Sequence, residues 1–339
     1  MKYYWGRDVK RERLSIAMCT YNGARHLQEQ LDSFKSQTRM PDELVVCDDV
    51  STDETVEIVE AFASEAPFNV RLYVNEKNLG STKNFEKAIA ICEGDIIFLS
   101  DQDDVWLPDK LSKVAELLTQ FPEVAGVLTD AEIVDESLNL LGFYFWQATR
   151  FKRRQQGRAM KGKLGTLVKH NSSMSGATFA FRAKLRDIAL PIPEYWTHDA
   201  WIILIIAALA KLVVLPEQLN LWRQHELQQL GSWKKKSLLE MRDMSLNKEI
   251  TEDALFAAKQ YESAKERIEA MNFTDSAATD TKTKLLARLK EKSVHLQARS
   301  KMSTARIKRI PSILNELMSM RYFRYSSGFK SAVRDFFIS

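Results

Sequence analysis

Short apolar runs and amphipathic segments alternate along the first 130 residues. Each run leads into a polar or turn-forming stretch, which is typical of buried strands. The predicted strands lie at 14–19, 43–47, 70–74, 95–99 and 124–128. Helical periodicity and helix-start signals predict helices at 26–34, from 53, at 81–91 and at 108–120. This alternation predicts an α/β fold with a mostly parallel central sheet and helices on both faces.

The pattern is less regular in the second half of the chain. Residues 177–181 and 212–215 read as strands, and Asp199 opens a helix that runs to about residue 210. Beyond Trp233 the segment is helical, polar and basic, with no strand signal. We therefore expect an α/β domain over residues 1–232 and a helical C-terminal region over 233–339.

Composition narrows the class of protein. The 339 residues are 45% hydrophobic, which is enough for a large folded core. Three cysteines without metal-ligand spacing indicate reduced thiols and a cytoplasmic location. The longest apolar run, 200–215, is interrupted by Lys211 and is too short to span a bilayer.

The net charge of +4 is unevenly distributed. From Lys282 onward there are fourteen Lys and Arg residues against three acids. Leucines and isoleucines lie among them at helical spacing, which favours a helix on the anionic inner face of the cell membrane. The alternative is that this stripe packs on the rest of the protein or on a second copy, and the oligomeric state stays open. No nucleic-acid-binding motif accompanies the basic residues, so we expect no nucleic-acid partner.

The stretch FLSDQDDVW, residues 98–106, places Asp101, Asp103 and Asp104 directly after an apolar strand. Ligands of open parallel sheets bind at the carboxyl ends of the strands, where these carboxylates are expected to lie. Carboxylates this close repel one another unless a cation offsets them. Mg²⁺ commonly sits between one or two carboxylates and a substrate phosphate. The sequence alone leaves a second possibility, an acidic turn that caps the helix near Pro108.

Six motifs occur in order along the chain: SIAMCTYNG, VVCDDVSTDET, NLGSTKNFEKAI, FLSDQDDVWLPDKL, THDAW and WRQH. Together they resemble the family-2 inverting glycosyltransferases, and the form of the later motifs is similar to the bacterial polysaccharide branch that includes rhamnosyltransferases. The resemblance covers about residues 14–233. It implies a GT-A fold, a metal-binding DxD motif, Mg²⁺ or Mn²⁺ as cofactor, and a nucleoside diphosphate sugar as donor.

The resemblance also assigns the nucleotide-binding residues. Tyr21 would lie against the base, and Asp49 would accept a hydrogen bond from a pyrimidine N3–H, with Asp48 as its neighbour. Asp101 would lie near the ribose or the sugar, and Lys83 near the nucleotide. The alternatives are that the Asp48–Asp49 pair caps its own loop and that Lys83 is a solvated helix residue.

Metal and diphosphate contacts are assigned to two segments. Asp103 would bind the metal, and His225 would be a further metal ligand or touch the diphosphate. Arg223 would pair with phosphate, and Asp104 would share either duty or cap the next helix.

Asp199 matches the catalytic base of the family, which takes the proton of the attacking hydroxyl in a single displacement. Its alternative role is a helix N-cap. Trp201 follows as an acceptor-site candidate; Ala200 stands where many relatives have an aromatic residue.

We therefore expect a metal-dependent transferase that moves a sugar, with rhamnose a candidate, from a dTDP- or UDP-sugar to a hydroxyl of a surface polysaccharide such as O-antigen, or of a lipid-linked glycan. The rivals are a sugar nucleotidyltransferase and a non-catalytic scaffold that acts through its helical tail.

Overall fold

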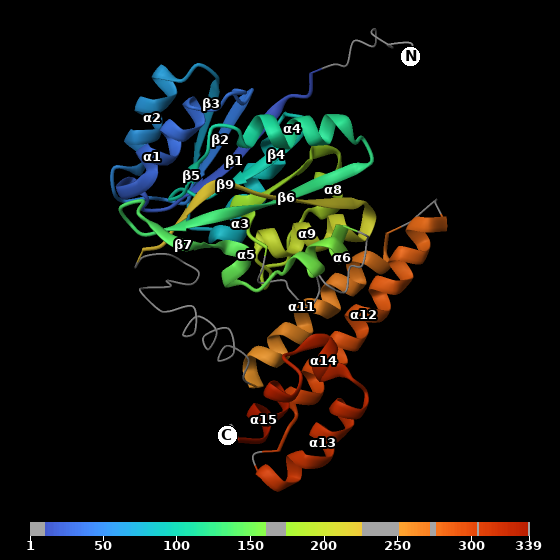
Figure 1. Ribbon diagram of the computed structural model, residues 1–339. Helices are drawn as coiled ribbons and strands as arrows, with labels where there is room; N and C mark the ends of the chain where they lie inside the picture. Colours follow the sequence, from blue (N-terminus) through green and yellow to red (C-terminus); the bar gives the residue numbers. More distant parts are fainter. Residues whose placement is uncertain (1–10, 161–173, 226–250, 272–275, 304, 338–339) are drawn as a thin grey trace.

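The computed structural model describes residues 11–160, 174–225, 251–271, 276–303 and 305–337. Its centre is a nine-stranded sheet in the order β3-β2-β1-β4-β8-β6-β9-β5, with β7 paired to β6 (Figure 1). The strands are β1 (Leu14–Thr20), β2 (Glu43–Asp48), β3 (Asn69–Val74), β4 (Ile96–Ser100), β5 (Val105–Trp106), β6 (Val124–Val134), β7 (Leu140–Tyr144), β8 (Phe179–Arg182) and β9 (Lys211–Arg223).

The two halves of the sheet differ in strand direction. The four strands β3, β2, β1 and β4 are parallel throughout, as the alternation of strands and helices predicts. In the second half β8 runs antiparallel to both β4 and β6, while β6 and β9 are parallel to each other. The predicted α/β architecture is confirmed, with a sheet that is mixed rather than parallel beyond β4.

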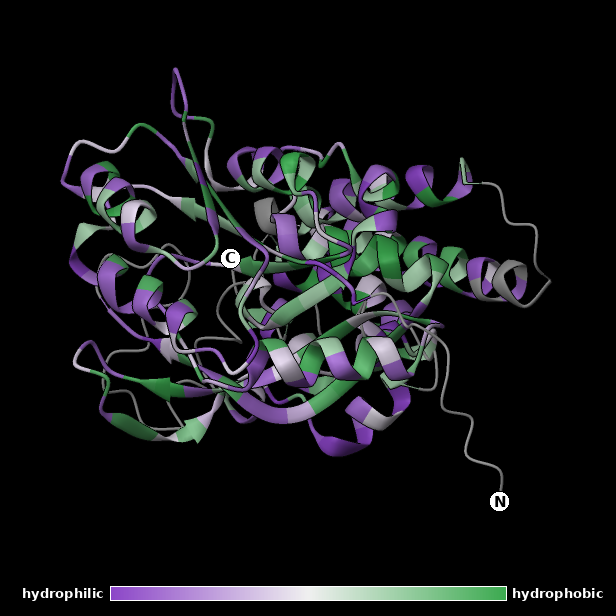
Figure 2. Ribbon diagram, turned by 90° about the horizontal axis from the view of Figure 1, so that it is seen from above, coloured by the Kyte–Doolittle hydropathy of each residue, from purple (hydrophilic) through white to green (hydrophobic). Residues whose placement is uncertain are grey.

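Both faces of the sheet are covered, which explains why its strands are apolar without alternation. On β1, Ala17 and Cys19 belong to one hydrophobic cluster, and Ile16 and Met18 belong to the other. Successive side chains of a strand point to opposite faces, so one strand supplies both clusters. Figure 2 shows hydrophobic residues concentrated in the interior and hydrophilic residues on the outward helix faces.

Helices α1, α2 and α4 contribute to one cluster, and α3 and α9 contribute to the other. Helix α9 is buried almost all round, as expected of a helix with no polar face. The helices of this part are α1 (Ala24–Lys35), α2 (Thr55–Glu65), α3 (Ser81–Ile91), α4 (Lys110–Gln120), α5 (Phe145–Ala148), α6 (Arg153–Met160), α8 (Arg186–Ala189) and α9 (His198–Leu209), with short 3₁₀ turns η2 (Gly176–Thr178) and η3 (Ala183–Leu185).

The C-terminal region is helical, and it extends away from the sheet in Figure 1. Leu285 and Leu289 are fully buried in the same cluster as α9, so the packing alternative holds for this part of the basic tail. No described helix has an apolar stretch long enough to cross a membrane. The predicted domain boundary at 232/233 lies outside the described residues. The C-terminal helices are α11 (Thr251–Glu269), α12 (Ser276–Ser300), α13 (Arg306–Met318), α14 (Arg321–Tyr325) and α15 (Phe329–Phe337).

Candidate active site

The candidate site lies where the parallel strands β1, β2 and β4 end side by side. Thr20 pairs with Asp48 at the ends of β1 and β2, and Met18 pairs with Ser100 on β1 and β4. The loops that follow these three strands carry the predicted nucleotide and metal residues. Their meeting at one edge of the sheet is what a parallel arrangement requires.

Gln102 ties two of these loops together. Its side-chain Oε1 accepts a hydrogen bond from the Tyr21 N–H at 2.8 Å, and its Nε2 donates to the Tyr21 carbonyl at 3.1 Å. A Cβ on Gly23 would lie 2.2 Å from Gln102 Oε1, so glycine leaves the space that this side chain occupies. Tyr21 as a residue is 51% exposed and is therefore accessible to a ligand.

Asp48 and Asp49 are both buried and are both bonded to neighbouring loops. Asp48 accepts hydrogen bonds from Thr20 Oγ1 and from the N–H and hydroxyl of Ser51. Asp49 accepts from the N–H groups of Leu79 and Gly80, at 2.7 and 2.8 Å, and from the Asn75 side chain. Three of the roughly four acceptor positions of this carboxylate are thus occupied. A base could bind only at the remaining Oδ2 position, so the nucleotide role of Asp49 stays a prediction.

The acidic loop after β4 contains two carboxyl groups with perturbed pKa values. Burial raises the pKa of Asp101 to about 7, and the negative charges of Asp103 and Asp199 add to the rise. Burial also raises the pKa of Asp104 well above its usual range, again with its acidic neighbours adding to the effect. The contribution of Asp199 to Asp101 places the predicted base in the same electrostatic environment as the acidic loop.

Lys110 is the buried cation beside this loop, and the sequence reading missed it. Only 2% of the residue is exposed, and its Nζ donates to the Ala177 carbonyl at 2.5 Å while lying 3.8 Å above the centre of the Trp106 ring. Burial lowers its pKa to about 7, whereas Asp104 and Asp101 favour its charged form. Lys110 therefore offsets part of the repulsion among the carboxylates. The signal available in the sequence was a lysine at the predicted start of an amphipathic helix, which is ordinarily solvated.

Asp103 and His225 meet although they lie 122 positions apart. His225 Nε2 is 2.8 Å from Asp103 Oδ2. A carboxylate oxygen and an imidazole nitrogen this close can bind one cation, and Mn²⁺ accepts both kinds of ligand. Among the residues that the structure describes, no group of three or more His, Cys, Asp or Glu side chains forms a metal site. The pair therefore fits a metal that takes its other ligands from a diphosphate and water, as Mg²⁺ often does.

Arg223 supports the acidic loop from below. Its Nε donates to the Asp103 carbonyl at 2.8 Å, its Nη1 donates to the Glu136 carbonyl at 2.7 Å, and its Nη2 bonds with Glu29. Its backbone N–H also donates to Asp104 Oδ1 at 3.2 Å. The side chain is 1% exposed, so it stabilises the loop and has no accessible surface for a phosphate.

Asp199 is the second residue of α9, and Thr197 holds the N-cap position. Its two oxygens accept from different N–H groups, Oδ2 from Gly176 at 3.0 Å and Oδ1 from Ala200 at 2.6 Å. Asp199 is therefore not the N-cap residue of α9. Its side chain instead links the 3₁₀ turn η2 to the first turn of α9. Its remaining lone pairs are available for a proton.

His198, next to Asp199, is buried to 9% exposure and stacks on Phe85 with ring centres 3.7 Å apart. Neither of its ring nitrogens has a hydrogen-bond partner within the described part of the chain. A Cβ on Gly176 would lie 2.8 Å from His198 Nε2. Gly176 thus leaves room for the imidazole while its N–H bonds to the candidate base Asp199.

Two further residues of the predicted site, Lys83 and Trp201, form hydrogen bonds with other parts of the protein. Lys83 Nζ donates to the Ile192 carbonyl at 2.7 Å and to Glu86 at 2.9 Å, so a nucleotide contact would require it to leave both. Trp201 is fully buried, and its Nε1 donates to the Ala189 carbonyl at 2.6 Å. Its ring has no surface from which to touch an acceptor, and we leave it out of the proposed site.

Comparisons with known proteins match part of this chain to a family. Residues 15–180 match the model described as Glycosyl transferase family 2. The chain is 27% identical over 220 residues to an uncharacterized glycosyltransferase of Nostoc sp., covering 63% of this chain and 65% of that protein. It is 34% identical over 105 residues to the dTDP-rhamnosyl transferase RfbG of Shigella flexneri, covering 30% and 36%. The chain thus spans less than two thirds of the length of either relative.

Solved structures agree on the fold. TarS 1-349 of S. aureus, solved in complex with UDP-GlcNAc, has a TM-score of 0.60 and 15% identity, with 96% of this chain and 91% of that chain covered. The mannosyltransferase PcManGT of Pyrobaculum calidifontis, in complex with GDP-Man and Mn²⁺, has a TM-score of 0.50 and 16% identity, covering 99% and 91%. The chain therefore has the predicted GT-A fold, and residues 15–180 form a glycosyltransferase family 2 domain.

Proposed function

We propose that the protein is a metal-dependent inverting glycosyltransferase that takes its sugar from a nucleoside diphosphate donor. One observation carries this proposal. Asp101 and Asp103 follow the carboxyl end of the parallel strand β4, and His225 lies 2.8 Å from Asp103. The negative charge of Asp199 acts on Asp101. A diphosphate leaving group and an attacking hydroxyl both need charged side chains at such a place.

The donor end of the site is formed by the loops after β1 and β2. The exposed Tyr21 ring offers a flat apolar surface for a base, and Gln102 fixes the backbone beneath it. Asp49 shapes the neighbouring loop and keeps one acceptor position for a base N–H. The dTDP-rhamnosyl transferase of Shigella flexneri and the UDP-GlcNAc complex of TarS support a dTDP- or UDP-sugar, and the former makes rhamnose a candidate sugar.

Asp103 and His225 would hold a divalent metal, Mn²⁺ or Mg²⁺. When bound, such a metal neutralises the charge that grows on a departing nucleoside diphosphate. Asp103 and His225 would hold the metal beside the acidic loop, and Arg223 keeps that loop in place. The Mn²⁺ of the mannosyltransferase with the same fold supports this assignment.

Asp199 would accept the proton of the acceptor hydroxyl as that hydroxyl attacks the anomeric carbon. The bonds from Gly176 and Ala200 fix the carboxylate in one orientation. Attack from the side opposite the leaving diphosphate inverts the anomeric centre.

The acceptor is proposed to be a glycan of a bacterial surface polysaccharide, such as O-antigen, or of a lipid carrier. A lipid-linked acceptor would place the enzyme on the cytoplasmic side, at the inner face of the cell membrane. The basic C-terminal helices would make the contact.

The test is a donor screen with the full chain. UDP-, dTDP- and GDP-sugars are incubated with Mn²⁺, with Mg²⁺ or with EDTA, and release of nucleoside diphosphate is measured. We expect metal-dependent release from at least one dTDP- or UDP-sugar and its loss in Asp199→Asn. Absence of release from every donor, together with absence of metal-dependent nucleotide binding, would reject the proposal.

A further inference from the structure

Helix α13 has two faces of opposite character. One face carries Arg309, Ile313 and Glu316, all nearly buried against the other C-terminal helices. The other face carries a stripe of four apolar side chains that we call the α13 stripe. It comprises Ile307 (79% exposed), Ile310 (40%), Leu314 (52%) and Met318 (84%).

The stripe is continuous along the helix. Its members are spaced three, four and four residues apart, so they fall on one side of an α-helix. The sequence neighbours of Ile307 fall on opposite sides of the stripe in an α-helix. These neighbours are Arg306 and Lys308, and both are exposed. An apolar stripe bordered by cations is the pattern of a helix that lies in a membrane interface.

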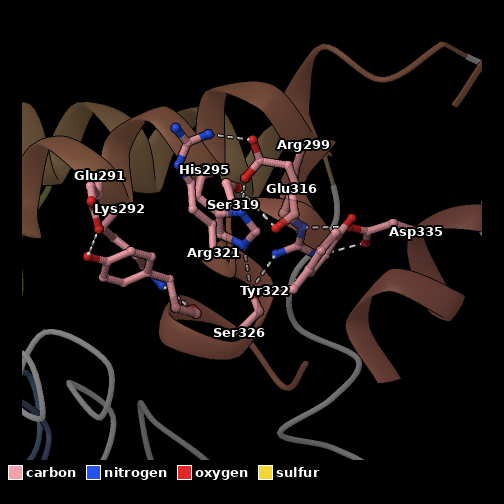
Figure 3. A network of polar contacts seen from close by, with 11 residues as sticks. Glu291, Lys292, His295, Arg299, Glu316, Ser319, Arg321, Tyr322, Ser326 and Asp335 are labelled. Atoms are coloured by element: carbon pink, nitrogen blue, oxygen red, sulfur yellow. Dashed lines mark hydrogen bonds and ion pairs between the residues drawn. The ribbon is translucent and has the colours of Figure 1, made fainter. Parts of the chain in front are cut away.

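The acids of this region are withdrawn from its surface into the network of Figure 3. Glu316 is 1% exposed and accepts from Arg321 at 2.7 Å, and it lies 2.7 Å from His295 Nδ1. Asp335 accepts two bonds from Arg299, at 2.6 and 2.8 Å, and one from the Tyr322 hydroxyl at 2.7 Å.

As a result, the exposed charge of this region has one sign. Between residues 301 and 337, with residue 304 outside the description, every exposed charged side chain is cationic. These side chains are Lys301, Arg306, Lys308, Arg324 and Lys330. Of them, Arg324 is paired with the partly exposed Glu291 of α12. A two-fold contact with a second copy would bring this cationic surface against itself, which is unfavourable. An anionic lipid surface complements both the stripe and its charge.

We propose that the α13 stripe docks on an anionic lipid surface, with Arg306 and Lys308 at the headgroups and the four apolar side chains among the upper acyl chains. This inference deepens the proposed function and rests on it, because the proposed function supplies the reason for an acceptor at the lipid surface. It also leaves Leu285 and Leu289 of α12 out of the contact, since both side chains are packed in the core.

The experiment is co-sedimentation of the full chain with vesicles of phosphatidylglycerol and phosphatidylcholine, and with vesicles of phosphatidylcholine alone. One variant combines Ile307→Ser, Leu314→Ser and Met318→Ser; another combines Arg306→Gln and Lys308→Gln. The matched controls are Leu140→Ser, an exposed apolar residue 65% accessible on β7, and Lys211→Gln on the sheet. Melting curves and donor hydrolysis in the absence of vesicles are recorded for each protein.

We expect the wild type and both controls to bind the anionic vesicles and to lose binding as salt is raised. The serine variant should lose at least about tenfold in partition, since it removes most of the insertable surface. The glutamine variant should lose roughly 30-fold, at about 1 kcal/mol per cation. Donor hydrolysis should be unchanged in both, which separates this result from a failure of the proposed function.

Two results would overturn the inference. One is equal vesicle binding by the wild type and the serine variant. The other is a concentration-dependent dimer that the serine substitutions abolish in a protein that does not bind vesicles, since the stripe would then be an interface between two copies.

Discussion

His225 Nε2 lies 2.8 Å from Asp103 Oδ2, which joins the end of β9 to the acidic loop after β4. The contact depends on the antiparallel pairing of β5 with β9, in which Val105 lies opposite Leu221. Arg223 reinforces it by bonding to the Asp103 carbonyl two residues before His225. A pair of possible metal ligands, one carboxylate oxygen and one imidazole nitrogen, distinguishes this candidate site from one built of carboxylates alone.

We expect His225→Ala to weaken Mn²⁺-dependent nucleotide binding by at least about tenfold, the smaller end of what loss of a supporting partner usually costs a metal site. The loss should be smaller with Mg²⁺, which relies on oxygen ligands. Calorimetric titration of UDP at saturating metal measures both. His26→Ala is the matched control, since its ring lies 5.0 Å from that of His225. Equal losses with both metals would remove His225 from the ligand set.

Asp199 should separate catalysis from folding. Asp199→Asn removes the proton acceptor, so turnover should fall by a factor on the order of 10² to 10⁴. Because both carboxylate oxygens accept N–H bonds, the amide can keep only one, and stability should fall by about 1 kcal/mol. Asp199→Ala should lose both bonds and melt lower still. Wild-type turnover in the Asn variant would mean that the base lies elsewhere in the site.

Gly176→Ala tests how the base is held. The new methyl group would lie 2.8 Å from His198 Nε2 and 3.5 Å from the Asp199 Cβ, so the imidazole or the turn must move. We expect a stability loss of about 1–3 kcal/mol. Turnover should fall by roughly 100-fold, because a small displacement of a catalytic group is costly. The control is Gly157→Ala in α6, where nothing lies within 4 Å of the added carbon. An unchanged rate in Gly176→Ala would show that the orientation of Asp199 does not depend on this turn.

Lys110→Met removes the buried cation and keeps most of its volume. Its bond to the Ala177 carbonyl is lost, and Asp101 and Asp104 lose an opposite charge, so stability should fall by about 2 kcal/mol. A positive lysine also opposes a bound cation, so Mn²⁺ should raise the melting temperature more in the variant than in the wild type. Lys113→Met, which loses only a surface pair with Glu217, is the control. A smaller Mn²⁺ shift in Lys110→Met would show that Lys110 supports the metal site instead.

Much of the fold could be read from local sequence patterns. The runs at 14–19, 43–47 and 95–99 became the parallel strands β1, β2 and β4, because apolar continuity reports burial on both faces. The predicted strands at 124–128 and 212–215 proved to be the first parts of β6 and β9. The extension of β6 is buried but partly polar, and that of β9 is partly polar and only partly buried, so periodicity does not distinguish either extension from a loop. Strand direction beyond β4 depends on long-range pairing that no local pattern encodes.

The site was predictable as a set of residues but not as a set of contacts. A strand end followed by acids indicated Asp101 and Asp103, and the resemblance to the family-2 glycosyltransferases indicated Asp199. The partners that hold them could not be foreseen, because Gln102, Lys110 and Gly176 act through distant backbone groups. The side chains of Arg223 and Trp201 are of types that often bind ligands, but both are buried and contact other protein groups.

The central claim is that Asp103 anchors a metal which the nucleoside diphosphate needs for binding. Its most direct test is calorimetric titration of UDP and dTDP into wild-type protein and Asp103→Asn, with Mn²⁺ and with EDTA. The matched control is Asp109→Asn, an exposed aspartate at the start of α4. We expect wild type and control to bind one of the two nucleotides tightly only with Mn²⁺, and Asp103→Asn to bind it equally weakly in both conditions. Undiminished Mn²⁺-dependent binding by Asp103→Asn would contradict the account.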